Sequence, residues 1–357
     1  MTETDVMGTA LIYHPGMLAH DAGWGHLERA ARLEAVLAGI GRQWGAVPIQ
    51  VPEPAAVAAL GAVHAPAYVQ MIAAIAARGG GQWDSDTVIS PASYEAARLA
   101  AGAACRAVDL ALDPARAGGR SAFALGRPPG HHACADLAMG FCLFNNVAVA
   151  ARHAQREHGV GRVLIVDWDV HHGNGTQDVF YMDPSVAYFS THQWPFYPGT
   201  GKWSESGAGT GAGTTCNVAL PAGTDDAGYQ AAFVEALAPF ARRFAPDLIL
   251  VSAGYDAHHA DPLGHMAVTS GGFAMLTGLV MDLAAELCAG RLAFVLEGGY
   301  DMGGLTQGVI ATLERLNGLD LASRIVTDPP ATSRHPPALS PTVRAALDRT
   351  LRHHQFV

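Results

Sequence analysis

The sequence predicts an α/β fold in which helices cover both faces of a central, mainly parallel sheet. Short apolar runs suited to buried strands alternate with longer, Ala-rich stretches suited to helices. Almost every apolar run passes directly into a segment dense in Gly, His, Asp or Tyr. In open α/β sheets, functional sites form beyond the carboxyl ends of the strands, so these segments are expected to converge on one site.

The elements follow from this alternation. Seven apolar runs predict strands at residues 9–13, 121–125, 163–167, 186–190, 216–220, 248–252 and 292–296. The intervening stretches predict helices at residues 28–40, 54–59, 66–78, 91–112, 145–158, 228–244, 270–289 and 304–316, several with Pro near the start, where no amide hydrogen bond is lost.

No internal repeat or long linker divides the central part of the chain. We therefore expect residues 1–320 to form a single domain, and residues 321–357 to pack on the same domain as a strap and a short helix. The strap is predicted from the Pro-, Ser- and Thr-rich composition of residues 327–341, and the last helix covers residues 341–354.

Composition excludes several classes of protein. Hydrophobic residues make up 50% and charged residues 15% of the 357 residues, so the chain is neither disordered nor a coiled coil. A net charge of -10, with Lys202 the one lysine, argues against a nucleic-acid partner. Five cysteines without a CxxC pair indicate reduced thiols and a cytoplasmic protein. The acidic N-terminus and the lack of a long apolar stretch argue against secretion and against a membrane span.

A metal site is predicted at the strand ends. Asp169 and His171 are two residues apart after one apolar run, so both side chains can reach one ion, and Asp256 after another run is the natural third ligand. Three protein ligands that leave a position for water are typical of catalytic zinc. Oxygen-rich ligands also suit Fe²⁺ or Mn²⁺.

The adjacent His131 and His132 follow a rigid Pro-Pro-Gly turn and are candidates for acid–base work beside the metal. Asp167 and Asn174 flank the ligand segment and are placed to orient the two rings. A carboxylate partner favours a cationic imidazole and an amide partner favours a neutral one, so the pair would divide into a stabiliser and a base. Tyr300, after two glycines, is a candidate hydrogen-bond donor to an oxyanion.

At these residues the sequence resembles the zinc-dependent histone deacetylase family, most closely its class II branch and the bacterial histone deacetylase-like amidohydrolases. The resemblance runs in order over residues 13–305. The segments that carry it are Arg127-Pro-Pro-Gly-His-His, Gly140-Phe-Cys-Leu-Phe-Asn-Asn, Asp167-Trp-Asp-Val-His-His-Gly-Asn-Gly-Thr-Gln, Ser252-Ala-Gly-Tyr-Asp and Leu296-Glu-Gly-Gly-Tyr.

The resemblance implies an arginase-deacetylase fold with about eight parallel strands. It implies hydrolysis of an N-acetyl amide on a long amine, with Zn²⁺ held by Asp169, His171 and Asp256. It further implies that His131, paired with Asp167, is charged and that His132 activates water and then protonates the leaving amine. Tyr300 would polarise the acetyl carbonyl.

Further positions carry over from the family. Gly140, Phe141 and Tyr197 would form the substrate tunnel, in which a buried four-methylene lysine stem gains roughly 3 kcal/mol at about 0.8 kcal/mol per CH₂. Family members that prefer acetylpolyamines carry Glu seven residues after the last metal ligand. Leu263 stands there in this chain. An apolar residue at that position favours acetyl-lysine in a protein or peptide, or a small acylated amine.

The family also implies two monovalent cation sites, usually K⁺, one of them close to the zinc. An acidic residue that holds the substrate backbone at the rim would be Asp84 or Asp86, and Arg32 would line an acetate exit. The K⁺ close to the zinc would be bound by Asp167, Asp169, His171 and Ser190.

Two departures and three alternatives remain. The segment His26-Leu-Glu-Arg-Ala30 stands where the family usually has His-Pro-Glu-Arg-Pro, and Asp301 replaces the usual Asn after the tyrosine.

An acetylpolyamine amidohydrolase would keep the chemistry and change the substrate. A catalytically silent domain that binds acylated ligands or a partner would be expected to lack a metal ligand or the tyrosine, and all are present. A ureohydrolase with two Mn²⁺ would need more carboxylates, and the His pair argues against it. Formation of a homo-oligomer stays open.

Overall fold

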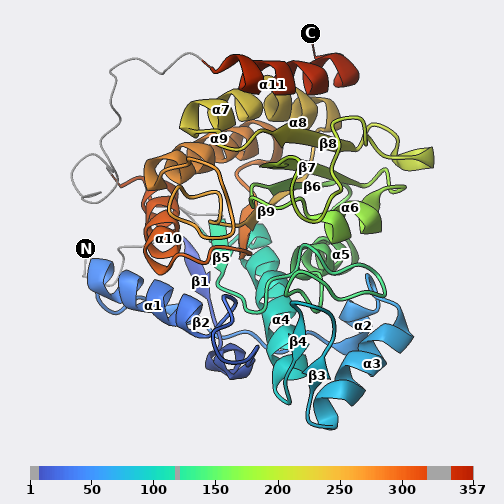
Figure 1. Cartoon of the computed structure of the whole chain (residues 1–357), viewed down its shortest axis with the longest axis vertical. Coiled ribbons are helices and arrows are strands. Elements are labelled where there is room, and N and C mark those ends of the chain that lie inside the picture. The colour runs from blue at the N-terminus through green and yellow to red at the C-terminus, as the bar shows by residue number, and fades with distance from the viewer. Residues whose placement is uncertain (1–7, 117–120, 320–338, 357) are drawn as a thin grey trace.

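The structure is a computed structural model that describes residues 8–116, 121–319 and 339–356. Its centre is an eight-stranded sheet in the order β2-β1-β5-β10-β9-β6-β7-β8, and every strand pair in it is parallel (Figure 1). The fold class predicted from the sequence is therefore confirmed. The strands are β1 (Ala10–Ile12), β2 (Ile49–Gln50), β5 (Ser121–Ala124), β6 (Val163–Asp167), β7 (Val186–Gln193), β8 (Thr215–Leu220), β9 (Leu248–Ala253) and β10 (Leu292–Leu296). A separate antiparallel pair joins β3 (Gly81–Gln82) to β4 (Val88–Ile89).

All seven strands predicted from apolar runs are present, and the eighth, β2, was missed. Both residues of β2 are exposed at the edge of the sheet, so no apolar run marks it. By contrast, every residue of β6, β9 and β10 is buried, because helices cover both faces of the sheet at these strands.

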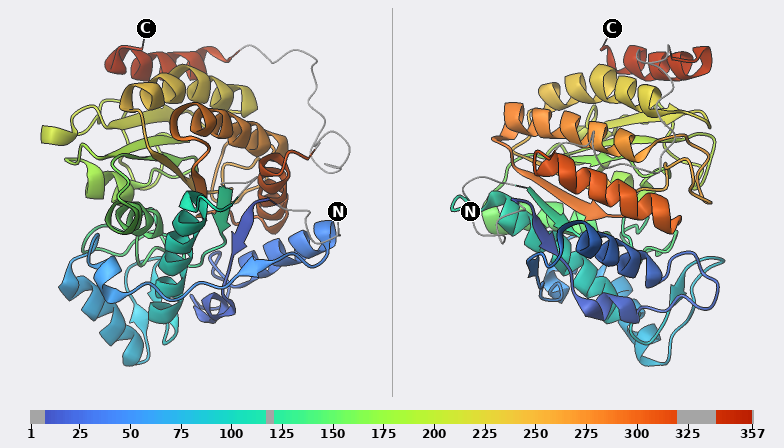
Figure 2. Two further views of the ribbon diagram at one scale, coloured as in Figure 1. Left: turned by 180° about the vertical axis from the view of Figure 1, so that it is seen from behind. Right: turned by 90° about the vertical axis from the view of Figure 1, so that its left-hand side faces the viewer.

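Strand order determines which face each helix covers. A right-handed crossover that moves toward β8 places its helix on one face, and one that moves toward β2 places it on the other. The first group is α4 (Ser93–Leu112), α5 (Asn146–His158) and α6 (Asn174–Phe180). The second is α1 (Ala31–Trp44), α7 (Asp226–Ala232), α8 (Ala238–Phe244) and α9 (Ser270–Cys288), with α10 (Met302–Leu316) packed between α1 and α9 (Figure 2). The remaining helices are η1 (Pro15–Ala19), α2 (Val57–Leu60), α3 (Pro66–Ala77), η2 (Gly209–Gly211), the π-helical η3 (Phe233–Leu237) and α11 (Pro341–His354).

The helices differ from prediction in several places, among them the helix predicted at 54–59, which begins at Val57. The first helix begins at Ala31 rather than at residue 28, because Glu28 is fully buried and accepts hydrogen bonds from Arg127 and Arg32. The helix predicted at 228–244 begins two residues earlier, where Asp225 caps it, and contains a π-helical turn between α7 and α8. Helix α6 was not predicted.

One described helix, α9, is long and apolar enough to cross a membrane by length and composition. More than half of its most apolar stretch is buried inside this fold, where α9 packs against β9 and α10. Its hydrophobicity is accounted for by its place in the core.

The C-terminal helix packs on the same body of structure. Helix α11 covers β8, and the Thr350 hydroxyl donates to the carbonyl of Asn217 on that strand at 2.9 Å. Its apolar side is buried through Val343, Leu347 and Leu351. The predicted boundary near residue 320 and most of the predicted strap at 327–341 lie outside the described residues.

We expect Leu347→Ala to destabilise the protein by about 2–5 kcal/mol, because the side chain is fully buried and its removal leaves a cavity. Urea denaturation followed by circular dichroism measures the change. Arg349→Ala, at an exposed position of the same helix, is the control and should change stability by less than about 0.5 kcal/mol. Equal stability of both variants would show that α11 does not pack on β8.

Candidate active site

Three predicted metal ligands meet at the carboxyl edge of the sheet. Asp169 and His171 follow β6 and Asp256 follows β9, and these two strands are neighbours in the sheet. One ligand atom from each residue lies within 4.8 Å of the others, and all three residues are buried. The parallel register of β6 and β9 is what brings these distant parts of the sequence together.

The donor set of this triad suits a divalent cation. Asp169 accepts hydrogen bonds from the backbone N–H of His171 and Gly298, both at 2.9 Å, and Asp256 Oδ1 accepts one from Val170 at 2.8 Å. Asp256 Oδ2 is buried and accepts no hydrogen bond from the described residues, although the His171 Nδ1 atom lies 3.3 Å from it. Burial, together with the nearby Asp169 carboxylate, raises the pKa of Asp256 to about 7. A buried carboxylate oxygen without a donor is costly unless a cation lies beside it.

Two glycines allow the carboxylates to come this close to the backbone. A Cβ atom on Gly254 would overlap the carboxylate of Asp169, and one on Gly298 would overlap Asp256 Oδ2. These glycines stand in the segments after β9 and β10, so their small size, rather than flexibility, sets the shape of the site.

His131 and His132 lie side by side above this triad, with ring centroids 4.1 Å apart. His131 Nδ1 is 3.1 Å from Asp167 Oδ2, and His132 Nδ1 is 2.8 Å from Asn174 Oδ1. The two partners are those predicted from the sequence.

The electrostatic environment separates the two rings. Burial alone would lower the pKa of His131, but the Asp169 and Asp167 carboxylates outweigh it and raise that pKa to about 10. Burial and the positive charge of His131 hold the pKa of His132 well below its usual range. At neutral pH, His131 is therefore a cation and His132 a neutral imidazole, which makes His132 the one able to accept a proton.

Glu297, which sequence reasoning did not select, holds the His pair in place. Its Oε2 accepts hydrogen bonds from the backbone N–H of Gly130 at 2.7 Å and of His131 at 3.2 Å, and its Oε1 accepts one from the Ser252 hydroxyl. Burial raises the pKa of Glu297 to about 7. Glu297 could have been selected from the sequence because it is a charged residue directly after the apolar run of β10.

Asp167 is likewise fixed by a residue that was not selected. The buried Tyr188 hydroxyl donates to Asp167 Oδ2 at 3.0 Å and accepts from the backbone N–H of Gly173. Ser190, predicted as part of a K⁺ site, stands opposite Asp167 in the β6–β7 register, with its hydroxyl 2.9 Å from His192 Nδ1. The predicted K⁺ residues are thus neighbours in the structure.

Tyr300 is held by contacts on two sides. Asp261 Oδ2 accepts the backbone N–H of Tyr300 at 2.6 Å and of Asp301 at 3.0 Å. The Arg32 guanidinium lies 4.8 Å from the centroid of the Tyr300 ring and donates to the Gly299 carbonyl at 2.7 Å. Asp261 was not selected from the sequence. Asp301, a departure from the family, caps α10 by accepting from the Gly304 backbone N–H.

A cavity of about 230 Å³ is lined by several of these groups. Phe141 stands on its wall with a left-handed backbone (φ 68°), and the Thr87 hydroxyl accepts its N–H at 3.2 Å. Gly140 precedes it with φ 56°, where a Cβ would overlap the His132 ring. The residues that line the cavity are Asp86, His132, Gly140, Phe141, His171, Phe196, Tyr197, Pro262, Leu263 and Tyr300.

The structure separates the two acidic rim candidates. Asp86 lines the cavity, whereas Asp84 accepts the backbone N–H groups of Asp86 and Thr87 and shapes their turn. His26 packs edge-on against Phe141 at 4.8 Å and its Nε2 bonds the Asp86 carbonyl, so the unusual segment 26–30 supports the rim. Arg32 lies beneath Tyr300 and is not among the described residues that line this cavity.

Comparison with known proteins agrees with this geometry. The Histone deacetylase domain matches residues 26–316. The chain is 43% identical to "Histone deacetylase 10, chloroplastic" of Oryza sativa subsp. japonica, over 86% of this chain and 71% of that protein. It is 42% identical to human "Polyamine deacetylase HDAC10", over 87% of this chain and 48% of that protein. It is 43% identical to the "Histone deacetylase-like amidohydrolase" of Pseudomonas aeruginosa, over 73% of this chain and 68% of that protein.

A solved structure, that of the HDA15 HD domain, superimposes with a TM-score of 0.87 at 35% identity. The match covers 98% of this chain and 94% of that one.

Gly298→Ala is expected to weaken divalent metal binding about 10- to 100-fold, because its Cβ would displace the Asp256 carboxylate. Equilibrium dialysis with Zn²⁺ measures the affinity. Gly271→Ala is the matched control, since its Cβ would make only an ordinary contact at 3.5 Å. Unchanged affinity in Gly298→Ala would mean that the metal is held elsewhere.

Proposed function

This chain belongs to the histone deacetylase family, and from that premise we propose that it removes acetyl groups from acetyl-lysine in peptides or proteins. The observation that carries the proposal is a cavity lined both by the aromatic Phe141 and Tyr197 and by the polar groups of the site, His132, His171 and Tyr300. A long, unbranched acylated amine suits this lining, because its methylenes would contact the aromatic rings while its amide would reach the polar groups.

Asp169, His171 and Asp256 would hold the metal, and their two carboxylates and one imidazole suit Zn²⁺ or Fe²⁺. When bound there, the ion supplies a Lewis acid that makes water more acidic and polarises the acetyl carbonyl. Asp167, Asp169, His171 and Ser190 would hold a structural K⁺ nearby, as in the family.

The His pair would move the protons. His132 uses Nδ1 to donate to Asn174, which leaves Nε2 as the acceptor for a proton from water. The same nitrogen then returns that proton to the nitrogen of the amide, which therefore leaves as a neutral amine. His131 stays protonated beside Asp167 and stabilises negative charge that develops in the transition state.

Tyr300 would donate its phenolic hydrogen to the oxygen of the acetyl group as that oxygen becomes negative. Burial raises the pKa of the Tyr300 hydroxyl well above its usual value, so it remains a donor at neutral pH. The backbone N–H bonds to Asp261 and the Arg32 contact hold the ring in position before the substrate arrives, and such preorganisation is the source of the catalytic effect.

Two features of the rim favour acetyl-lysine over an acetylpolyamine. Leu263 presents an apolar side chain to the cavity and gives no countercharge to a distal amine. Asp86 lines the cavity, and its carboxylate would accept backbone N–H groups of a peptide. The polyamine alternative rests on the 42% identity to human "Polyamine deacetylase HDAC10". The presence of every metal ligand, both histidines and the tyrosine argues against a silent binding domain.

The setting of the enzyme follows from composition. The five cysteines are free, which supports the reducing cytoplasm as its location. The net charge of -10 attracts any basic substrate, so it does not separate the two substrate classes, and it argues against a nucleic-acid partner.

Tyr300→Phe is expected to lower kcat about 10²- to 10³-fold, because one preorganised donor to the oxyanion is lost. Bound zinc should stay unchanged, since Tyr300 is not a ligand. Acetate release and zinc content are measured on the same sample, with Tyr181→Phe, half-buried and away from the cavity, as control. Full turnover by Tyr300→Phe would remove the assigned role.

The substrate is tested by acetate release from an acetyl-lysine peptide and from acetylspermidine in parallel. We expect a higher kcat/KM for the peptide, and loss of activity after EDTA treatment that added Zn²⁺ restores.

Three results would contradict parts of this proposal. A large advantage for acetylspermidine would keep the mechanism and overturn the substrate. Activity that survives full removal of metal would overturn the mechanism. A protein with zinc bound that turns over neither compound would favour another acyl amide or a binding role.

A further inference from the structure

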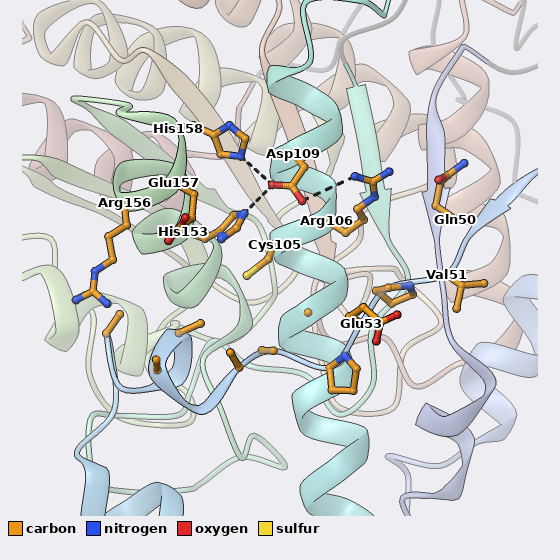
Figure 3. Close-up of a pocket in the computed structure, with 18 residues that line it drawn as sticks. Gln50, Val51, Glu53, Cys105, Arg106, Asp109, His153, Arg156, Glu157 and His158 are labelled. Carbon is orange, nitrogen blue, oxygen red and sulfur yellow. Dashed lines mark hydrogen bonds and ion pairs between the residues drawn. The ribbon is translucent and has the colours of Figure 1, made fainter.

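A second cluster of metal-binding side chains lies outside the active site. Asp109 stands in the last turn of α4, and His153 and His158 lie near the end of α5. Asp109 Oδ1 is 2.6 Å from His153 Nε2 and 2.8 Å from His158 Nε2, so both rings turn the same nitrogen toward one carboxylate oxygen (Figure 3). The three ligand atoms lie within 4.8 Å of one another.

The cluster is at the opposite edge of the sheet from the active site. Helix α5 begins beside the His pair, where the Asn146 side chain donates to the Pro128 carbonyl, and it ends at His158, five residues before β6 starts. The cluster therefore lies at the amino edge, on the wall of a surface pocket of about 830 Å³. Figure 3 shows His153, His158 and Asp109 converging between α4 and α5 beside this pocket.

The electrostatics of this position favour a cation. The C-terminal ends of α4 and α5 meet here, and each carries partial negative charge from unpaired carbonyl groups. Asp109 adds a full negative charge to the end of α4, whose last turn contains no basic residue. The Arg106 guanidinium is 3.9 Å from Asp109 Oδ2. It therefore contacts the carboxylate oxygen that the two imidazoles do not contact.

The other charged groups on the pocket wall nearly balance. Arg156 and Glu157 come from α5, and Glu53 comes from the segment before α2. The side chains of Asp109, His153 and His158 are 20–32% exposed, so an ion can reach them from solvent.

Cys105, one turn before Asp109, also lines the pocket. Its sulfur is not among the ligand atoms that lie within 4.8 Å of one another in this cluster. The ligand set is therefore two imidazoles and one carboxylate.

We propose that Asp109, His153 and His158 form a second metal site, which binds a divalent transition ion of the Zn²⁺ class. Two imidazole nitrogens and one carboxylate oxygen are the donor types of open zinc sites, and Ni²⁺, Co²⁺ and Cu²⁺ accept the same set. Bound metal replaces the two N–H bonds to Asp109 and links α4 to α5. The remaining coordination positions face the pocket, where water or a small anionic ligand can bind.

The test is a count of bound Zn²⁺ per chain on the intact enzyme. The protein is dialysed against buffered free Zn²⁺, and metal and protein are quantified by mass spectrometry and absorbance. We compare the unchanged protein with the double variant His153→Asn/His158→Asn. His353→Asn, another exposed histidine of a helix end, is the matched control.

The double variant should bind one Zn²⁺ fewer per chain, and His353→Asn should bind as much as the unchanged protein. The test compares the number of bound Zn²⁺ per chain between two proteins with the same active site, so the difference does not depend on how that site is filled. The double variant should keep its deacetylase activity. Co²⁺ added to unchanged protein that carries only one Zn²⁺ per chain should give a visible absorption band that the double variant lacks.

Added Zn²⁺ should also raise the unfolding temperature of unchanged protein that starts with one Zn²⁺ per chain, and leave that of the double variant, loaded in the same way, unaltered. Equal Zn²⁺ counts for the two proteins would overturn the proposal and leave a hydrogen-bonded Asp-His-His cluster. Loss of Zn²⁺ by His353→Asn alone would move the site to the C-terminal helix.

Discussion

The structure depends on a concentration of buried negative charge at the carboxyl edge of its sheet. Asp167, Asp169, Asp256 and Glu297 are all fully buried there, at the ends of three adjacent strands. Such a group is stable only with nearby cations and donors, because unpaired buried charge is strongly unfavourable. His131 supplies one positive charge and backbone N–H groups supply donors, and a divalent metal bound by Asp169, His171 and Asp256 would offset the negative charge that remains.

The parallel sheet is what makes this concentration achievable. Neighbouring β6, β9 and β10 end at the same edge, so residues nearly 130 apart in sequence, such as Asp169 and Gly298, come within hydrogen-bond distance. Glycines at 254 and 298 then let the carboxylates lie against the backbone. The apolar strands stabilise the fold, and the polar residues at their ends form the site. A change that shifts the register of the strands would therefore move the metal ligands and the His pair together.

Sequence patterns predicted the parts of this arrangement that are local. Buried strands of a parallel sheet are apolar throughout, and the residues after them face the site, so β6 and β9 with Asp169, His171 and Asp256 could be found. Edge strand β2 escaped notice because it is short and exposed. Glu297 and Asp261 escaped because their partners are backbone N–H groups distant in sequence, which no residue pattern reports. The sequence also left open whether Asp84 or Asp86 is the rim residue. That choice depends on a turn in which Asp84 accepts the backbone N–H of Asp86, which no residue pattern shows.

The two candidate metal sites use the same kinds of side chain in different surroundings. At the active site the carboxylates are fully buried, backbone N–H groups fix their positions, and Asp256 Oδ2 accepts no hydrogen bond from the described residues, so a bound ion would offset an electrostatic cost. At the α4–α5 cluster the carboxylate is about one-third exposed and already satisfied by two imidazoles, so the protein is stable there without an ion. Burial therefore predicts tight, permanent binding at the first site and weaker, exchangeable binding at the second, which would respond to the supply of metal in its surroundings.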